Sequence, residues 1–215
     1  MYSDDKHSRD KLIGTQQQLV AKGLTSGTSG NVSVRTGTGM LITPTGVAAD
    51  TLKAEHIVHM SLDGTIPAGQ LSPSSEWQMH ADVYLNKPRE VTAVVHCHSP
   101  YATILACAHK PIPAQHYMVA AAGGYEIPLA DYATFGSKAL SEANLKALSN
   151  SSACLLANHG QLALGYDLES ALRLAETVEE QAFWYWGVLA IGTPQVLQRE
   201  QMDEVLTAFA SYGQQ

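Results

Sequence analysis

Apolar residues along this chain recur at two spacings, which predict a mixture of helices and strands. Helical spacing of apolar positions, or helix start and stop signals, predict helices at 6–22, 72–86, 99–108, 137–148, 168–191 and 199–210. Short apolar or β-branched runs bounded by turn residues predict strands at 32–34, 40–42, 57–62, 93–98, 153–157 and 162–164. In the second helix, Ser72 is expected to be the N-cap and Pro73 the first helical residue.

One predicted strand carries two histidines close to its end. His96 and His98 lie two residues apart, so the period of an extended strand directs both imidazoles to one face and Cys97 to the other. This arrangement can chelate a metal ion. An isolated His-x-His is equally typical of a strand end that happens to carry two polar residues, so a second signal is needed.

A third histidine at the end of another strand supplies that second signal. His159 follows the apolar run 153–157 directly, and Gly160 beside it would let the backbone pass close to an ion. Three histidines form the ligand set of many catalytic zinc sites, which leave one position for water, a carboxylate or substrate. The pattern therefore favours a metal site.

Three segments could hold an anion through backbone amides and hydroxyls. They are the glycine-rich loop 25–31, the turn 43–46 and the serine-rich segment 72–76. Each also has an ordinary explanation as a turn or a helix cap, and Glu76 could simply complement the helix dipole. His80, one turn beyond Glu76, is expected to be an ordinary surface histidine or one with satisfied hydrogen bonds.

Composition narrows the class of protein. The chain has 215 residues, of which 45% are hydrophobic, so we expect one domain over residues 1–215. Its 13 lysines and arginines are scattered against 20 acidic residues, and the net charge of −7 excludes a basic nucleic-acid surface. We expect no membrane span, no signal region and no disulfide framework, which together predict a cytoplasmic protein.

Five motifs together identify a family. In order and spacing, the segments 27–31, 43–46, 74–76, 96–98 and 158–160 resemble the class II aldolase/adducin family, and within it the branch that acts on L-fuculose 1-phosphate. Further similarity is dense at 112–124 and 132–136. The resemblance implies an α/β fold, a three-layer α/β/α sandwich with a central, mainly antiparallel sheet. It also implies a homotetramer with active sites at the subunit interfaces.

The resemblance also implies a role for each matching residue. Glu76, His96, His98 and His159 would bind one Zn²⁺ per subunit, Glu76 would also act as acid/base, and Tyr117 would donate a proton across a subunit interface. Substrate phosphate would be held by Gly30, Asn31, Thr45, Gly46, Ser74 and Ser75. Phe135, Phe209 and Tyr212 would line the aldehyde side.

The implied reaction is cleavage of a ketose 1-phosphate such as L-fuculose 1-phosphate to dihydroxyacetone phosphate and lactaldehyde or a related aldehyde. Aldolases for 5-deoxyribulose 1-phosphate or methylthioribulose 1-phosphate are an alternative. An epimerase of ribulose 5-phosphate is less favoured, since that branch usually has aspartate at the position of Glu76. A non-catalytic adducin-like interaction domain is disfavoured by the intact set of metal ligands.

Overall fold

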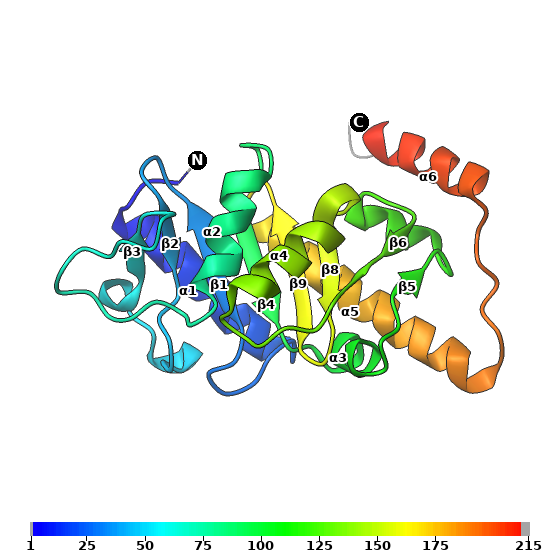
Figure 1. The fold of residues 1–215 in the computed structure, drawn as a ribbon, viewed down its shortest axis with the longest axis horizontal. Helices are drawn as coiled ribbons and strands as arrows, with labels where there is room; N and C mark the ends of the chain where they lie inside the picture. Colours follow the sequence, from blue (N-terminus) through cyan, green and yellow to red (C-terminus); the bar gives the residue numbers. More distant parts are fainter. Residues whose placement is uncertain (1, 212–215) are drawn as a thin grey trace.

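A seven-stranded sheet runs through the middle of the molecule in the computed structural model, which describes residues 2–211 (Figure 1). Its strand order is β3-β2-β1-β4-β9-β8-β7, and every pair is antiparallel except β7 with β8. The strands are β1 (Asn31–Arg35), β2 (Met40–Ile42), β3 (Val58–Met60), β4 (Ala93–Cys97), β7 (Leu129–Ala130), β8 (Ala153–Leu156) and β9 (Gly160–Gly165).

Helices cover both faces of this sheet. One apolar core joins the sheet to α1 (Lys6–Ala21), α3 (Pro100–Cys107) and α5 (Leu168–Ile191). A second core joins the opposite face to α2 (Trp77–Asn86) and α4 (Lys138–Ala147). The expected α/β/α sandwich with a mainly antiparallel sheet is confirmed.

Alternation along β4 shows how the sequence produces these two cores. Val95 and Cys97 lie in the core beneath α3 and α5, whereas Val94 lies in the core beneath α2 and α4. Because side chains alternate along a strand, His96 shares the face of Val94. Cys97 is fully buried on the other face, as its position in the strand predicts.

Short elements complete the chain beyond the main sheet. β5 (Ile112–Pro113) pairs with β6 (Glu126–Ile127), and the 3₁₀ helix η3 (Tyr117–Ala122) lies between them in sequence. The last helix, α6 (Arg199–Ser211), packs on η3 and stands apart from the sheet in Figure 1. Three further 3₁₀ turns lie at Ala49–Thr51, Ala54–His56 and Leu148–Asn150.

The start of α2 differs from the prediction. Ser72 and Pro73 do not begin the helix; Pro73 instead forms an isolated antiparallel bridge with Pro44, and Ser74 N–H donates to Thr43 O at 3.0 Å. The helix begins at Trp77, with Glu76 as its N-cap residue. The serine-rich segment is therefore held alongside the 43–46 turn, which brings two of the candidate anion-binding segments together.

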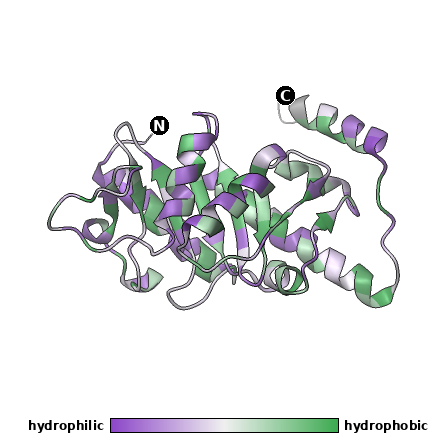
Figure 2. Ribbon diagram, in the orientation of Figure 1, coloured by the Kyte–Doolittle hydropathy of each residue, from purple (hydrophilic) through white to green (hydrophobic). Residues whose placement is uncertain are grey.

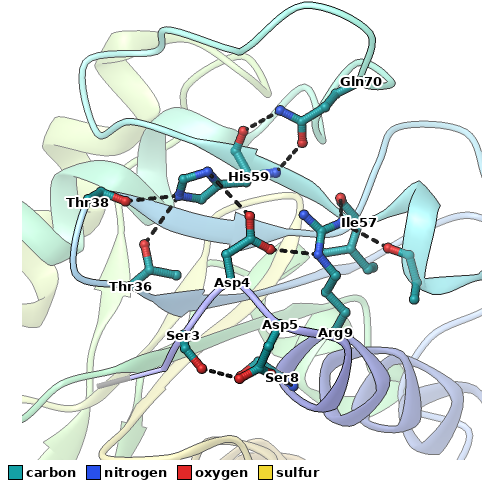
Figure 3. Close-up of polar contacts among 11 residues, drawn as sticks. Ser3, Asp4, Asp5, Ser8, Arg9, Thr36, Thr38, Ile57, His59 and Gln70 are labelled. Carbon is teal, nitrogen blue, oxygen red and sulfur yellow. Dashed lines mark hydrogen bonds and ion pairs between the residues drawn. The ribbon is translucent and has the colours of Figure 1, made fainter.

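Polar contacts fasten the N-terminal segment to the outer edge of the sheet (Figure 3). Arg9 Nε donates to Asp4 Oδ1 at 2.7 Å, and Arg9 Nη1 donates to the backbone oxygens of Ala54 and Ile57. His59 on β3 lies between Asp4, at 3.6 Å, and the Thr38 hydroxyl, at 3.2 Å. These groups anchor the edge strand β3 far along the sheet from β4.

Candidate metal centre and its cavity

Sheet topology brings the three candidate histidines together. His96 lies on β4, and His98 follows that strand immediately. β4 pairs with β9, which forms a hairpin with β8, so the turn that carries His159 lies next to the end of β4. Gly160 makes this approach possible, because a Cβ there would lie 2.5 Å from Cys97 O and 2.9 Å from the His98 ring.

The three imidazoles form a nearly symmetrical cluster. Their ring centroids are 4.8 to 4.9 Å apart, with interplanar angles of 66° to 74°. One ligand atom from each of the three lies within 4.8 Å of the others. The Nε2 atoms of His96 and His98 are 3.1 Å apart. Three nitrogens that converge in this way can bind one metal ion.

Burial keeps these imidazoles in the form that binds metal. Burial is the largest cause that lowers the pKa of His96, His98 and His159, and it holds the pKa of His96 well below its ordinary value. The ring of His159 lowers the pKa of His96 and His98 further. Since His96 Nδ1 lies 2.8 Å from Gln161 O, it must be the protonated nitrogen, which leaves the Nε2 lone pair facing the cluster.

Glu76 completes the cluster from the start of α2. Its carboxylate oxygens lie 3.2 Å from His96 Nε2 and 3.3 Å from His159 Nε2, and Oε2 accepts a hydrogen bond from Asn31 Nδ2 at 3.0 Å. Glu76 is buried, and its Oε1 has no hydrogen-bond partner. A buried, unpartnered carboxylate oxygen beside imidazole lone pairs is a donor set that a zinc ion fits.

A polar cavity of about 330 Å³ opens beside Glu76, His98 and His159. All the residues that the family resemblance assigned to phosphate line this cavity, namely Gly30, Asn31, Thr45, Gly46, Ser74 and Ser75. Phe135 lines it as well. The two glycines have left-handed backbone, with φ of +75° at Gly30 and +69° at Gly46, which directs their amides in a way other residues rarely can.

The structure does not bring every predicted residue to this cavity. Tyr117 and Phe209 are absent from its lining and contact each other instead, with ring centroids 6.4 Å apart, where η3 meets α6. Tyr117 is 47% exposed. Tyr212 lies outside the described residues.

Several residues near the candidate metal centre were given no individual role in the site by the sequence. Thr28, Ser29, Tyr132 and Asn158 line the cavity too. His80 is fully buried and hydrogen bonded on both ring nitrogens, so it is a satisfied histidine and not a surface one. Its position four residues after Glu76 places both on one face of α2, which is a signal the sequence does contain.

Fold and site together define an α/β/α protein with a pocket beside a cluster of histidines that could hold a metal ion. The chain belongs to the class II aldolase and adducin family, because the model of the Class II Aldolase and Adducin N-terminal domain matches residues 10–186. The family expected from the five motifs is therefore confirmed.

Curated relatives fall into two substrate groups at equal similarity. The chain is 47% identical over 205 residues to a 5-methylthioribulose-1-phosphate/5-deoxyribulose-1-phosphate aldolase of Rhodospirillum rubrum, covering 95% of this chain and 92% of the relative. It is 47% identical over 204 residues to an L-fuculose phosphate aldolase of Escherichia coli O157:H7, covering 94% of each. A solved L-fuculose 1-phosphate aldolase matches with a TM-score of 0.92 and 39% identity, covering 96% of this chain and 97% of that one.

Proposed function

We propose that this protein is a zinc-dependent aldolase that cleaves a ketose 1-phosphate to dihydroxyacetone phosphate and an aldehyde, as a single domain over residues 1–215. One observation carries the proposal: the His96, His98, His159 and Glu76 cluster borders a cavity lined by all six candidate phosphate residues. A metal site next to an anion site can hold a phosphorylated ketose at both ends.

Each group near the cavity has a role in this reaction. Bound zinc would polarise the substrate carbonyl and stabilise the enediolate that forms on cleavage. Glu76, with one oxygen free of hydrogen bonds, is placed to take the hydroxyl proton whose loss begins the cleavage. Amides and hydroxyls at 28–31, 45–46 and 74–75 would bind the phosphate without lysine or arginine, since neither is found among the described residues that line the cavity.

The protein would act as a homotetramer with its sites between subunits. Tyr117 is exposed and lies away from its own cavity, so it would have to serve the cavity of a neighbour. Exposed apolar side chains on α5, including Phe183, Trp186 and Ile191, provide surface for such contacts. The end of this helix has the green of hydrophobic residues in Figure 2.

No helix among the described residues could span a bilayer. The cytoplasmic location expected from the sequence remains part of the proposal.

The aldehyde half of the substrate distinguishes the two groups of relatives. Both L-fuculose 1-phosphate and the deoxy- or methylthio-ribulose 1-phosphates share the dihydroxyacetone-phosphate half, which the phosphate residues and the zinc ligands would bind. Phe135, which is exposed at the cavity, is placed to contact the differing half.

A coupled assay for dihydroxyacetone phosphate tests the proposal. The zinc-loaded protein is offered L-fuculose 1-phosphate, 5-deoxyribulose 1-phosphate and methylthioribulose 1-phosphate in parallel. Release of dihydroxyacetone phosphate from at least one is expected, and the highest kcat/KM identifies the aldehyde. Release from none of them, with zinc bound, would overturn the proposal, and conversion of ribulose 5-phosphate instead would favour an epimerase.

A further inference from the structure

A chain of buried hydrogen bonds leads away from Glu76 into the protein. Glu76 Oε2 is 3.0 Å from Asn31 Nδ2, and Asn31 Oδ1 is 2.5 Å from His80 Nε2. His80 Nδ1 is 2.7 Å from Ser33 Oγ, which is 2.8 Å from the Tyr84 hydroxyl. Glu76, the N-cap residue of α2, is followed at intervals of four residues by His80 and Tyr84 on one face of that helix. Asn31 and Ser33 lie on the same face of β1.

Only one assignment of protons satisfies every contact in this chain. A carboxylate accepts only, so Asn31 must turn its amide NH₂ to Glu76 and its oxygen to His80. His80 must then carry its proton on Nε2 and accept at Nδ1 from the Ser33 hydroxyl. Ser33 in turn accepts from Tyr84. The opposite tautomer of His80 would place a lone pair against the Asn31 oxygen.

The burial of these residues makes the arrangement rigid. His80 and Ser33 are fully buried, Tyr84 is 2% exposed and Asn31 is 4% exposed. Burial lowers the pKa of His80 to about 3, so the ring is neutral at neutral pH. The chain of contacts ends at the buried Tyr84 hydroxyl, inside the protein. The chain therefore holds groups in place and offers no route for protons to bulk water.

We infer that His80 is a positioning residue for the reaction: by fixing the amide of Asn31, it holds the carboxylate of Glu76 in the orientation that catalysis needs. This inference rests on the proposed function of Glu76. Without the Nε2–H of His80, the Asn31 amide could turn over and present its oxygen to the Glu76 carboxylate, which would repel it. The second Nδ2–H of Asn31 stays available for phosphate, so one amide would serve both ends of the substrate.

A pair of substitutions at His80 separates positioning from packing. His80→Leu keeps an apolar volume but removes the donor to Asn31. We expect kcat to fall about 10–100-fold, with a smaller rise in KM because Asn31 is also proposed to bind the phosphate. In His80→Gln, the side-chain amide can offer an N–H donor to Asn31 and an oxygen acceptor to Ser33. This variant should therefore recover most of kcat. The same two substitutions at His59 are the matched control, because that histidine contacts Asp4 and Thr38 and lies outside the cavity.

The tautomer of His80 gives a readout that does not depend on activity. In protein labelled with ¹⁵N-histidine, the His80 signals, identified by their loss in His80→Gln, should report a neutral ring protonated on Nε2.

Ser33→Ala tests the same arrangement if His80→Leu fails to fold. This substitution removes the donor to His80 Nδ1 and is expected to lower kcat several-fold.

Three results would overturn the inference. The first is a folded His80→Leu variant with the kcat of the wild type. The second is an equal loss of kcat in folded His80→Leu and His80→Gln, and the third is a His80 ring protonated on Nδ1. Failure of the proposed function looks different: the unmodified, zinc-loaded protein would then release no dihydroxyacetone phosphate, while the tautomer would still confirm or refute the hydrogen-bond arrangement.

Discussion

At the scale of single residues, the candidate metal centre combines groups that would be costly to bury alone. Three imidazoles and a carboxylate share a largely buried site, and their lone pairs converge. Such groups are stable in a folded protein when a cation or a set of hydrogen bonds compensates for the lost water. The removal of one ligand should therefore affect metal binding far more than it affects the fold.

His159→Ala should abolish tight zinc binding. The substitution leaves His96, His98 and Glu76 in place but removes the ligand that the β8–β9 turn supplies. We expect a loss in affinity greater than the roughly 10–100-fold that is typical when only an outer hydrogen-bond partner is removed. Metal analysis after dialysis against a weak chelator measures it, with His59→Ala as control. Stoichiometric zinc in the variant would contradict the assignment.

Buried His80 should make the fold sensitive to acid. Its folded pKa of about 3 lies below the ordinary value of 6.5, so below pH 6.5 the unfolded chain binds a proton that the folded chain does not. Stability should therefore fall by about 1.4 kcal/mol per pH unit from this residue alone between pH 6.5 and pH 3. Urea unfolding of metal-free protein at pH 7 and pH 5 should show a smaller loss for His80→Gln than for wild type. Equal losses would refute this account.

Three of the four proposed metal ligands lie at local sequence signals, whereas the family resemblance alone assigned Glu76 to the metal. His96 and His98 follow the period of a strand, and His159 follows an apolar run. The role of His80 depended on β1 lying beside α2, a contact between residues 47 or more positions apart, so a local pattern could not reveal its partners.

At the scale of elements, one carboxylate on α5 secures α3, the helix that follows β4. Glu179 Oε1 and Oε2 accept hydrogen bonds at 2.9 Å from the backbone N–H groups of Tyr101 and Ala102. Ser99 is the N-cap of α3, but its side chain makes no capping bond and accepts from Gln161 Nε2 instead. A side chain 77 residues away in sequence thus caps the helix.

Glu179→Gln should therefore destabilise the protein. The amide can replace only one of the two acceptors and lacks the charge that favours a helix N-terminus, so we expect a loss of about 1–2 kcal/mol. Chemical unfolding monitored by circular dichroism measures the change. Glu180→Gln, at the neighbouring exposed position, is the matched control and should be close to neutral. Equal stability of the two variants would show that Glu179 does not cap α3.

Helix boundaries show why element prediction succeeded in most places and failed at α2. The long helix at 168–191 begins at a capping box formed by Asp167 and Ser170, and its predicted bounds agree with the structure. Segment 72–76 carries equally good start signals, yet its backbone pairs with residues 43–45. Pairing between segments about thirty residues apart overrides a local preference for helix.

At the scale of the whole molecule, the residues proposed for catalysis form two separate groups. Glu76, His98 and His159 border the cavity, whereas Tyr117 lies with Phe209 where η3 meets α6. A closed ring of identical subunits could bring the second group of one subunit to the cavity of the next. Mass measurement in solution should then give four times the 23.0 kDa chain.

Subunit complementation tests this arrangement directly. Glu76→Gln and Tyr117→Phe homotetramers should each be nearly inactive. If every site takes Glu76 from one subunit and Tyr117 from its neighbour, then co-expression of the two variants should restore about a quarter of wild-type activity, because about one interface in four would combine two intact residues. Differently tagged chains would verify that mixed tetramers have formed. Mixed tetramers without recovered activity would show that Tyr117 does not serve a neighbouring site.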